Sequence, residues 1–109
     1  MKKVFLSMPI TGYDRTIRER YAKDTIERLR MEHPDWNIVN PFTVAERVES
    51  AFSALGVEPQ HQDYMDECFK EIRECDMVVF APDWNLSKGC TMEMNLSREL
   101  DLEYMFLGY

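Results

Sequence analysis

The sequence predicts an α/β fold, a small Rossmann-like or flavodoxin-like doubly wound parallel sheet, in a single domain that spans residues 1–109. Strand and helix patterns alternate from one end of the chain to the other, which is typical of a parallel sheet covered by helices. The continuously apolar run at 77–81 predicts a central strand that is buried on both faces. A chain of 109 residues has room for one domain with one modest core.

Each element is expected from its own pattern. An apolar run at 3–7 predicts the first strand, which Pro9 and Gly12 terminate. Asp14 is a candidate N-cap for a helix in which apolar residues recur at helical spacing as far as Met31. The further elements are a strand at 36–39, helices at 44–55 and 63–74, a strand at 77–81, a helix at 90–100 and a strand at 103–107.

The chain is acidic, with a formal net charge of −7 and an isoelectric point near 4.8. Surfaces that bind nucleic acid polymers or anionic membranes need clustered Lys and Arg side chains, so neither partner is expected. A small phosphorylated ligand is still compatible with this charge, because backbone N–H groups at a helix N-terminus bind phosphate by themselves. No stretch reaches the roughly 18 apolar residues of a transmembrane helix, so we expect a soluble, cytoplasmic protein.

The cysteines and histidines form no metal-binding or disulfide pattern. Cys68, Cys75 and Cys90 are odd in number, lie in apolar settings and show no CxxC spacing, and the chain has only two histidines. We therefore expect reduced, structural cysteines, no metal site and no cofactor. The GxGxxG pattern and the P-loop pattern are also absent, which argues against binding of a dinucleotide or a P-loop phosphate site.

Two loops, at 7–13 and 82–89, follow strands of the expected sheet, and ligands of open parallel sheets bind beyond the carboxyl ends of the strands. The second loop carries Asp83, Trp84, Ser87 and Gly89. An aromatic ring offers a surface for a base, and the free N–H groups of a helix N-terminus bind an anion. Glu93, expected on the first turn of the following helix, adds a carboxylate placed for reaction.

Each of these residues also has an ordinary structural interpretation. Trp84 is compatible with a packed or partly exposed loop aromatic, and Ser87 with a simple N-cap. Glu93 is compatible with a solvated side chain that the helix dipole favours, although no Ser-x-x-Glu capping box explains it. Ser7 and Thr11, two candidates for substrate binding, also fit turn chemistry and helix capping.

Two segments, KVFLSMPITG at 3–12 and ECDMVVFAPDWNLSKGCTMEMNL at 74–96, carry a resemblance to a known family. The chain resembles the nucleoside 2-deoxyribosyltransferase-like family, in particular a small branch related to the deoxynucleoside monophosphate N-glycosidases. The likeness runs from Lys3 to about Leu107 and is weakest from Thr43 to Gln62. The second segment is the more specific, because it fixes several motif residues together: Asp76, Trp84, Ser87, Gly89 and Glu93.

The resemblance implies roles for individual residues. Glu93 corresponds to the nucleophile of characterised relatives, and Ser87 corresponds to a phosphate contact of the deoxynucleotide hydrolases. In those enzymes the turn after the first strand lines the sugar and phosphate pocket, which implies Pro9, Ile10, Thr11 and Gly12.

One position departs from the family pattern. Relatives place an Asp on the helix before the buried strand, eight residues ahead of the Asp that starts that strand, and this chain has Cys68 there. The acid that assists the leaving group is therefore assigned to Asp83 as an interpretation, with Asp66 in reserve.

The expected reaction is cleavage or transfer at the N-glycosidic bond of a 2-deoxyribonucleoside or its 5′-monophosphate, through a covalent glycosyl-Glu93 intermediate. The helix N-terminus is expected to keep the Glu93 carboxylate ionised. Relatives are oligomers whose neighbouring subunits complete the site, which implies a homo-oligomer, a dimer or larger. Two alternatives stay open: a nucleotide-binding or sensing module that has lost turnover, with Cys68 as its marker, and an interaction domain that binds no ligand.

Overall fold

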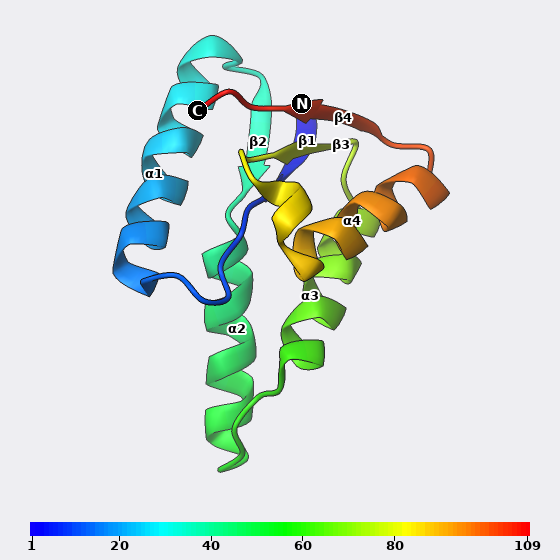
Figure 1. Cartoon of the computed structure of the whole chain (residues 1–109). Helices are drawn as coiled ribbons and strands as arrows, with labels where there is room; N and C mark the ends of the chain where they lie inside the picture. Colours follow the sequence, from blue (N-terminus) through cyan, green and yellow to red (C-terminus); the bar gives the residue numbers. More distant parts are fainter.

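The computed structural model describes all residues from 1 to 109, and its centre is one sheet of four strands in the order β2-β1-β3-β4. The strands are β1 (Lys2–Ser7), β2 (Trp36–Val39), β3 (Met77–Phe80) and β4 (Glu103–Phe106). Every neighbouring pair of strands is parallel. The predicted fold class, a small doubly wound α/β sheet, is confirmed (Figure 1).

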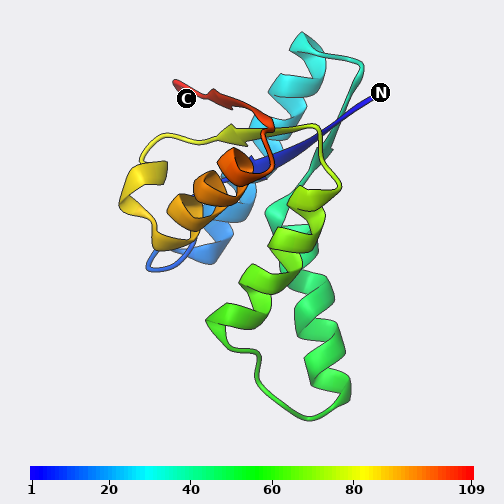
Figure 2. The ribbon, with the colours of Figure 1, turned by 90° about the vertical axis from the view of Figure 1, so that its right-hand side faces the viewer.

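Helices cover both faces of this sheet (Figure 2). They are α1 (Arg15–Glu32), α2 (Pro41–Ala54), α3 (His61–Arg73) and α4 (Lys88–Glu99), with a short 3-10 turn, η1 (Trp84–Leu86), before α4. Helix α1 packs on one face through Ala22 and Ile26, and α3 and α4 pack on the other through Ile72 and Met94. Helices α2 and α3 lie side by side and extend together away from the sheet (Figure 1).

The two central strands divide their side chains between the two cores. In β1, Val4 and Leu6 enter the core under α1, whereas Phe5 enters the core under α3 and α4. In β3, Val79 faces α1 and Val78 faces the opposite side, and both are completely buried. Strand β3 is therefore buried on both faces, as its continuously apolar sequence predicts.

Side-chain caps explain where the helices begin. Asp14 is the N-cap of α1 as predicted, because its carboxylate accepts from the backbone N–H of Ile17 at 3.1 Å. Helix α2 begins three residues earlier than expected, because Asn40 caps it and proline suits the first helical position. Helix α4 begins at Lys88, two residues early, because the Ser87 hydroxyl accepts from the N–H of Cys90 at 3.2 Å.

The strand order places a crevice at a definite point. The chain runs from β1 to β2 on one side and then crosses back to β3 on the other side of β1. In open parallel sheets, ligands bind at the carboxyl ends of the strands where the order reverses, here between β1 and β3. No helix is both long enough and apolar enough to cross a membrane.

Candidate functional site

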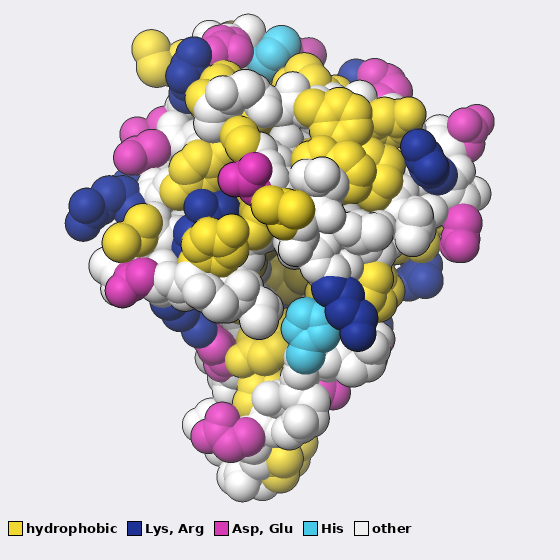
Figure 3. Space-filling model, viewed as in Figure 1, with side chains coloured by type: hydrophobic (Ala, Val, Ile, Leu, Met, Phe, Trp, Pro, Cys, Tyr) yellow, Lys and Arg dark blue, Asp and Glu magenta, His cyan; other side chains and the backbone are white.

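A pocket of about 670 Å³ opens at this crevice, and its volume lies in the range of roughly 300–1,000 Å³ that is usual for small-molecule sites. The first residues of all four helices line it: Arg15, Pro41, His61 and Lys88. Figure 3 shows a hollow on this face with a histidine and a basic side chain at its rim. The helix N-termini thus turn their positive dipole ends towards the pocket.

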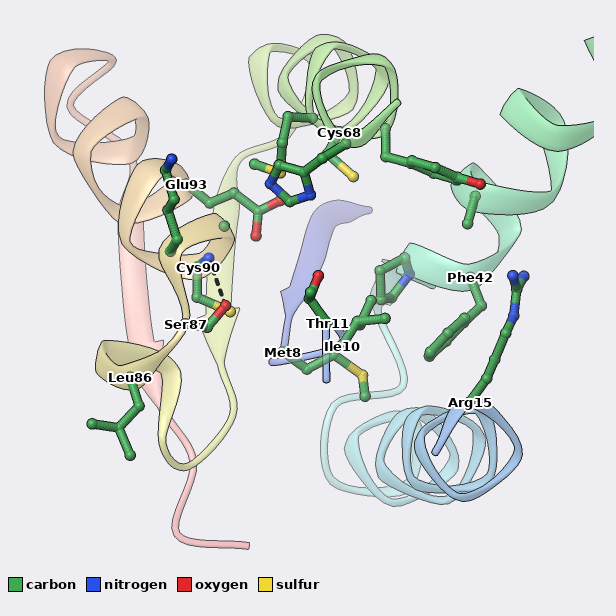
Figure 4. Close-up of a pocket in the computed structure, with 17 residues that line it drawn as sticks. Met8, Ile10, Thr11, Arg15, Phe42, Cys68, Leu86, Ser87, Cys90 and Glu93 are labelled. Atoms are coloured by element: carbon green, nitrogen blue, oxygen red, sulfur yellow. Dashed lines mark hydrogen bonds between the residues drawn. The ribbon is translucent and has the colours of Figure 1, made fainter. Parts of the chain in front are cut away.

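The carboxylate of Glu93 faces into the pocket (Figure 4). Only 6% of Glu93 is exposed, and its Oε1 accepts a hydrogen bond of 2.6 Å from the hydroxyl of Ser7. The hydroxyl of Ser97, one turn further along α4, donates to the backbone oxygen of Glu93 at 2.8 Å. Both the backbone and the carboxylate of Glu93 are therefore held by buried serines.

The protonation of Glu93 differs from the sequence-based expectation. Burial raises the pKa of Glu93 to about 7, although the side chains of Ser7 and Cys68 act in the opposite direction. The expectation that the helix dipole keeps this carboxylate ionised is wrong, because Glu93 is the sixth residue of α4 and not in its first turn. The dipole effect falls off within the first turn, so the cost of burying the charge is larger there.

Cys68, on α3, lies against the Glu93 carboxylate. Burial raises the pKa of the Cys68 thiol well above its usual range, and the neighbouring Glu93 acts in the same direction. Burial likewise raises the pKa of Cys75 and of Cys90 to about 11. All three cysteines are free, and as protonated thiols they are poor nucleophiles.

The predicted substrate-binding residues fall into two groups. Those that line the pocket are Ile10, Thr11, Ser87 and Gly89. Pro9 and Gly12 do not line it: the Pro9 carbonyl accepts from Arg18 Nε at 2.9 Å, and Gly12 has a positive φ of 88° in the turn. Ser7 lies below the pocket floor, where it is completely buried and contacts Glu93. The turn after β1 therefore reaches the pocket through Met8, Ile10 and Thr11.

Trp84 and the two candidate acids lie outside the pocket. The Trp84 ring packs against Phe80 and Phe106, and its centroid lies 5.4 Å from the ring centroid of each. Trp84 is therefore a packed loop aromatic and not a pocket wall. Asp83 is exposed in a left-handed conformation, and Asp66 is exposed and accepts from Gln62 at 2.8 Å. Neither carboxyl group is placed to act together with Glu93.

Several pocket residues were not found from the sequence. Arg15 donates to both oxygens of Glu49, at 2.5 and 2.9 Å, and Tyr64 donates to the same carboxylate at 3.1 Å. This network connects three helices at one wall of the pocket. Lys88 and His61 make no ion pair. A positional signal could have indicated Arg15 and Lys88, because residues that open helices after parallel strands gather at the carboxyl edge of the sheet. His61 and Tyr64 carry no such signal, because α3 follows another helix.

The pocket differs in charge from the rest of the molecule. Its basic side chains are Arg15, His61 and Lys88, and its one acidic side chain is Glu93, although the chain carries a net charge of −7. No group of three or more His, Cys, Asp or Glu side chains has a geometry that could hold a metal ion. The arrangement fits a ligand that has an anionic group near the mouth and an electrophilic centre near Glu93.

Comparisons with known proteins give a family and no function. No curated protein matches the chain significantly, and no solved structure does. The model of one protein family matches residues 2–106, which is nearly the whole chain. The chain therefore belongs to the family described as a domain of unknown function, DUF4406.

Proposed function

We propose that the protein cleaves or transfers the N-glycosidic bond of a 2-deoxyribonucleoside or its 5′-monophosphate, with Glu93 as nucleophile. The observation that carries this proposal is a buried carboxylate at the strand-order reversal, hydrogen-bonded through one oxygen to Ser7 and turned towards a ligand-sized pocket. The resemblance of the two motif segments to the nucleoside 2-deoxyribosyltransferase-like family gives that carboxylate its role.

In the proposed reaction a Glu93 oxygen bonds to C1′ of the sugar while the C1′–N bond breaks. The bonding electrons leave with the base, whose nitrogen takes up a proton from solvent or from His61 on the pocket wall. In the second step, water in a hydrolase or a nitrogen of a second base in a transferase bonds to C1′ while the C1′–O bond to Glu93 breaks. The Glu93 carboxylate is regenerated, and the proton of the attacking group passes to solvent. The attacking form is the carboxylate, so kcat/KM rises with pH and levels off above about 7, the pKa of Glu93.

The test is incubation of the purified protein with a panel of deoxynucleosides and their 5′-monophosphates, with released base followed by chromatography. Release of base from at least one member supports the proposal, and parallel reactions with a second free base separate transfer from hydrolysis. Absence of release from every member would contradict it.

A second candidate is a nucleotide-binding or sensing module without turnover. Cys68 favours it. A protonated thiol with a strongly raised pKa lies beside Glu93, at the position where the nucleoside 2-deoxyribosyltransferase-like family has an Asp. Calorimetric titration with the same panel separates the two functions. Binding without release of any base supports the sensing module.

Replacement of Ser87 with Ala is expected to weaken binding of a monophosphate more than that of the nucleoside. The hydroxyl accepts from Cys90 and lines the pocket, so its own proton is free to reach a phosphate oxygen. A hydrogen bond to a charged group contributes roughly 1.5–3 kcal/mol, about ten- to a hundredfold in affinity. Asp14→Ala, which removes the cap of α1, is the control for lost helix capping. Equal losses for both ligands would show that Ser87 only caps its helix.

A homo-oligomer is also proposed, because an aromatic patch formed by Trp84, Tyr104 and Phe106 covers the edge strand β4 (Figure 3). We expect a dimer or larger in sedimentation, and Phe106→Asp is expected to shift it towards the monomer. Tyr13→Asp is a matched control, because Tyr13 and Phe106 are each 50% exposed and Tyr13 lies outside the patch. A wild-type monomer at micromolar concentration is the contrary result.

A further inference from the structure

Ser7 is a polar residue at the end of an otherwise apolar strand. It closes β1, is completely buried, and pairs with Phe80 in the parallel register. Its backbone oxygen accepts from the N–H of Ala81 at 2.9 Å, which fixes the residue in the sheet. A buried hydroxyl costs free energy unless it is hydrogen-bonded, so the buried Ser7 hydroxyl requires a hydrogen-bond partner.

That partner is the candidate nucleophile. The Ser7 hydroxyl donates to Glu93 Oε1 at 2.6 Å, a length typical of a hydrogen bond to an ionised oxygen. The side chain of Cys90 also interacts with the Ser7 hydroxyl. The bond joins the rigid central strand to α4 and occupies Oε1 of Glu93, while the carboxylate as a whole lines the pocket next to Cys68.

We propose that Ser7 is a positioning residue: its hydroxyl holds Oε1 of Glu93 so that Oε2 faces the substrate. This rests on the proposed function of Glu93. Ser7 itself does not touch the substrate, because it is completely buried beneath the pocket floor. A strand residue is well suited to this role, since sites built on strands are held more rigidly than sites on loops.

The same bond has a second effect, on protonation. A donor to a carboxylate stabilises its charged form, so the Ser7 hydroxyl, and the Cys68 side chain of α3 beside it, oppose the burial that raises the pKa of Glu93. Loss of one hydrogen bond to a charged group is expected to raise the proton affinity of Glu93 roughly ten- to a hundredfold. Because the Glu93 titration of the wild type has its midpoint near pH 7, loss of the Ser7 hydroxyl then leaves only about 1–10% of Glu93 ionised at pH 7.

The chain offers a matched control in Ser97. It is also completely buried and also donates to Glu93, but to the backbone oxygen at 2.8 Å and not to the carboxylate. Ser7→Ala and Ser97→Ala therefore each remove one hydrogen bond that a buried hydroxyl donates to Glu93. Only the first removes a bond to the reacting group.

The experiment measures the titration of the Glu93 carboxyl carbon by NMR in the wild type and both variants, and kcat and KM against pH. Ser7→Ala is expected to move the Glu93 midpoint up by about one to two pH units and to lower kcat at pH 7 about 5- to 50-fold, with partial recovery at higher pH and KM unchanged. Ser97→Ala is expected to leave the midpoint in place.

An unmoved midpoint in Ser7→Ala, or an equal shift in Ser97→Ala, overturns the proposal. Thermal unfolding of both variants checks that each is folded at the temperature of the titration. If the wild type releases no base, the proposed function fails, but the NMR titration still decides whether Ser7 controls the Glu93 carboxylate.

Discussion

Replacing Glu93 with Gln is expected to lower the release of base more than about 10³-fold, the scale of loss seen when enzymes lose a nucleophile. Gln keeps the size and the helix propensity of Glu but lacks the charge and most of the nucleophilicity. Its amide oxygen can still accept from Ser7, so the local packing is retained. Substrate binding is expected to survive, which calorimetric titration of the variant measures.

The matched control is Glu99→Gln, at an exposed position of the same helix. It carries the same chemical change without touching the pocket, so its turnover is expected to equal that of the wild type. A Glu93→Gln variant that turns over as fast as the control shows that the nucleophile is another group.

Glu93 is also expected to make the protein less stable as the pH rises. Its pKa is about 7 in the folded state and near 4.5 in an ordinary, solvated state, so between these values the folded protein binds more protons than the unfolded chain. The free energy of unfolding therefore decreases with pH across this window. The contribution of Glu93 is fully present below about pH 4.5 and is lost as the pH passes about 7.

Urea unfolding of the wild type and of Glu93→Gln at pH 5 and pH 8 measures this effect. From pH 5 to pH 8, the free energy of unfolding of the variant is expected to rise by on the order of 2–3 kcal/mol relative to that of the wild type. The comparison cancels the contributions of other groups, such as Glu49 and Glu71, whose pKa is lowered by Arg15 and Arg47 respectively. A stability difference that does not change with pH would mean that Glu93 is not buried as described.

The fold class follows from local pattern, and the element boundaries depend on finer contacts. The alternation of strands and helices and the doubly buried β3 are both encoded within short segments. The start of α2 differs from the prediction because the helical apolar spacing begins only at Val44, whereas Asn40 caps the helix and Pro41 is its first residue. Ile17 continues the apolar spacing of α1 and yet is 62% exposed, because periodicity does not say how far a core extends.

The candidate site was predictable only where its residues lie together in a short segment of the sequence. Glu93 was found because it lies in one short motif with Ser87 and Gly89, and all three line the pocket. The contact between Ser7 and Glu93 joins residues 86 positions apart, and no local pattern reports it. The direction of the Trp84 ring could not be predicted either, because Phe106 comes from a strand after the motif.

The ionisation of Glu93 illustrates the same limit. Position near a helix start favours a charged carboxylate, and burial opposes it. The balance depends on how much solvent reaches the side chain, which only the packed structure determines. At 6% exposure the burial is the larger effect.

Mass spectrometry of a trapped intermediate tests the role of Glu93 most directly. A 2-deoxy-2-fluoro nucleoside or its monophosphate destabilises the oxocarbenium-like transition state, so the glycosyl ester accumulates if the second step is slow. We expect wild-type protein to gain the mass of one fluorinated sugar, on the peptide that contains Glu93, and Glu93→Gln to gain none. Base released by the wild type without any such adduct, or an adduct on a peptide that lacks Glu93, would contradict the account.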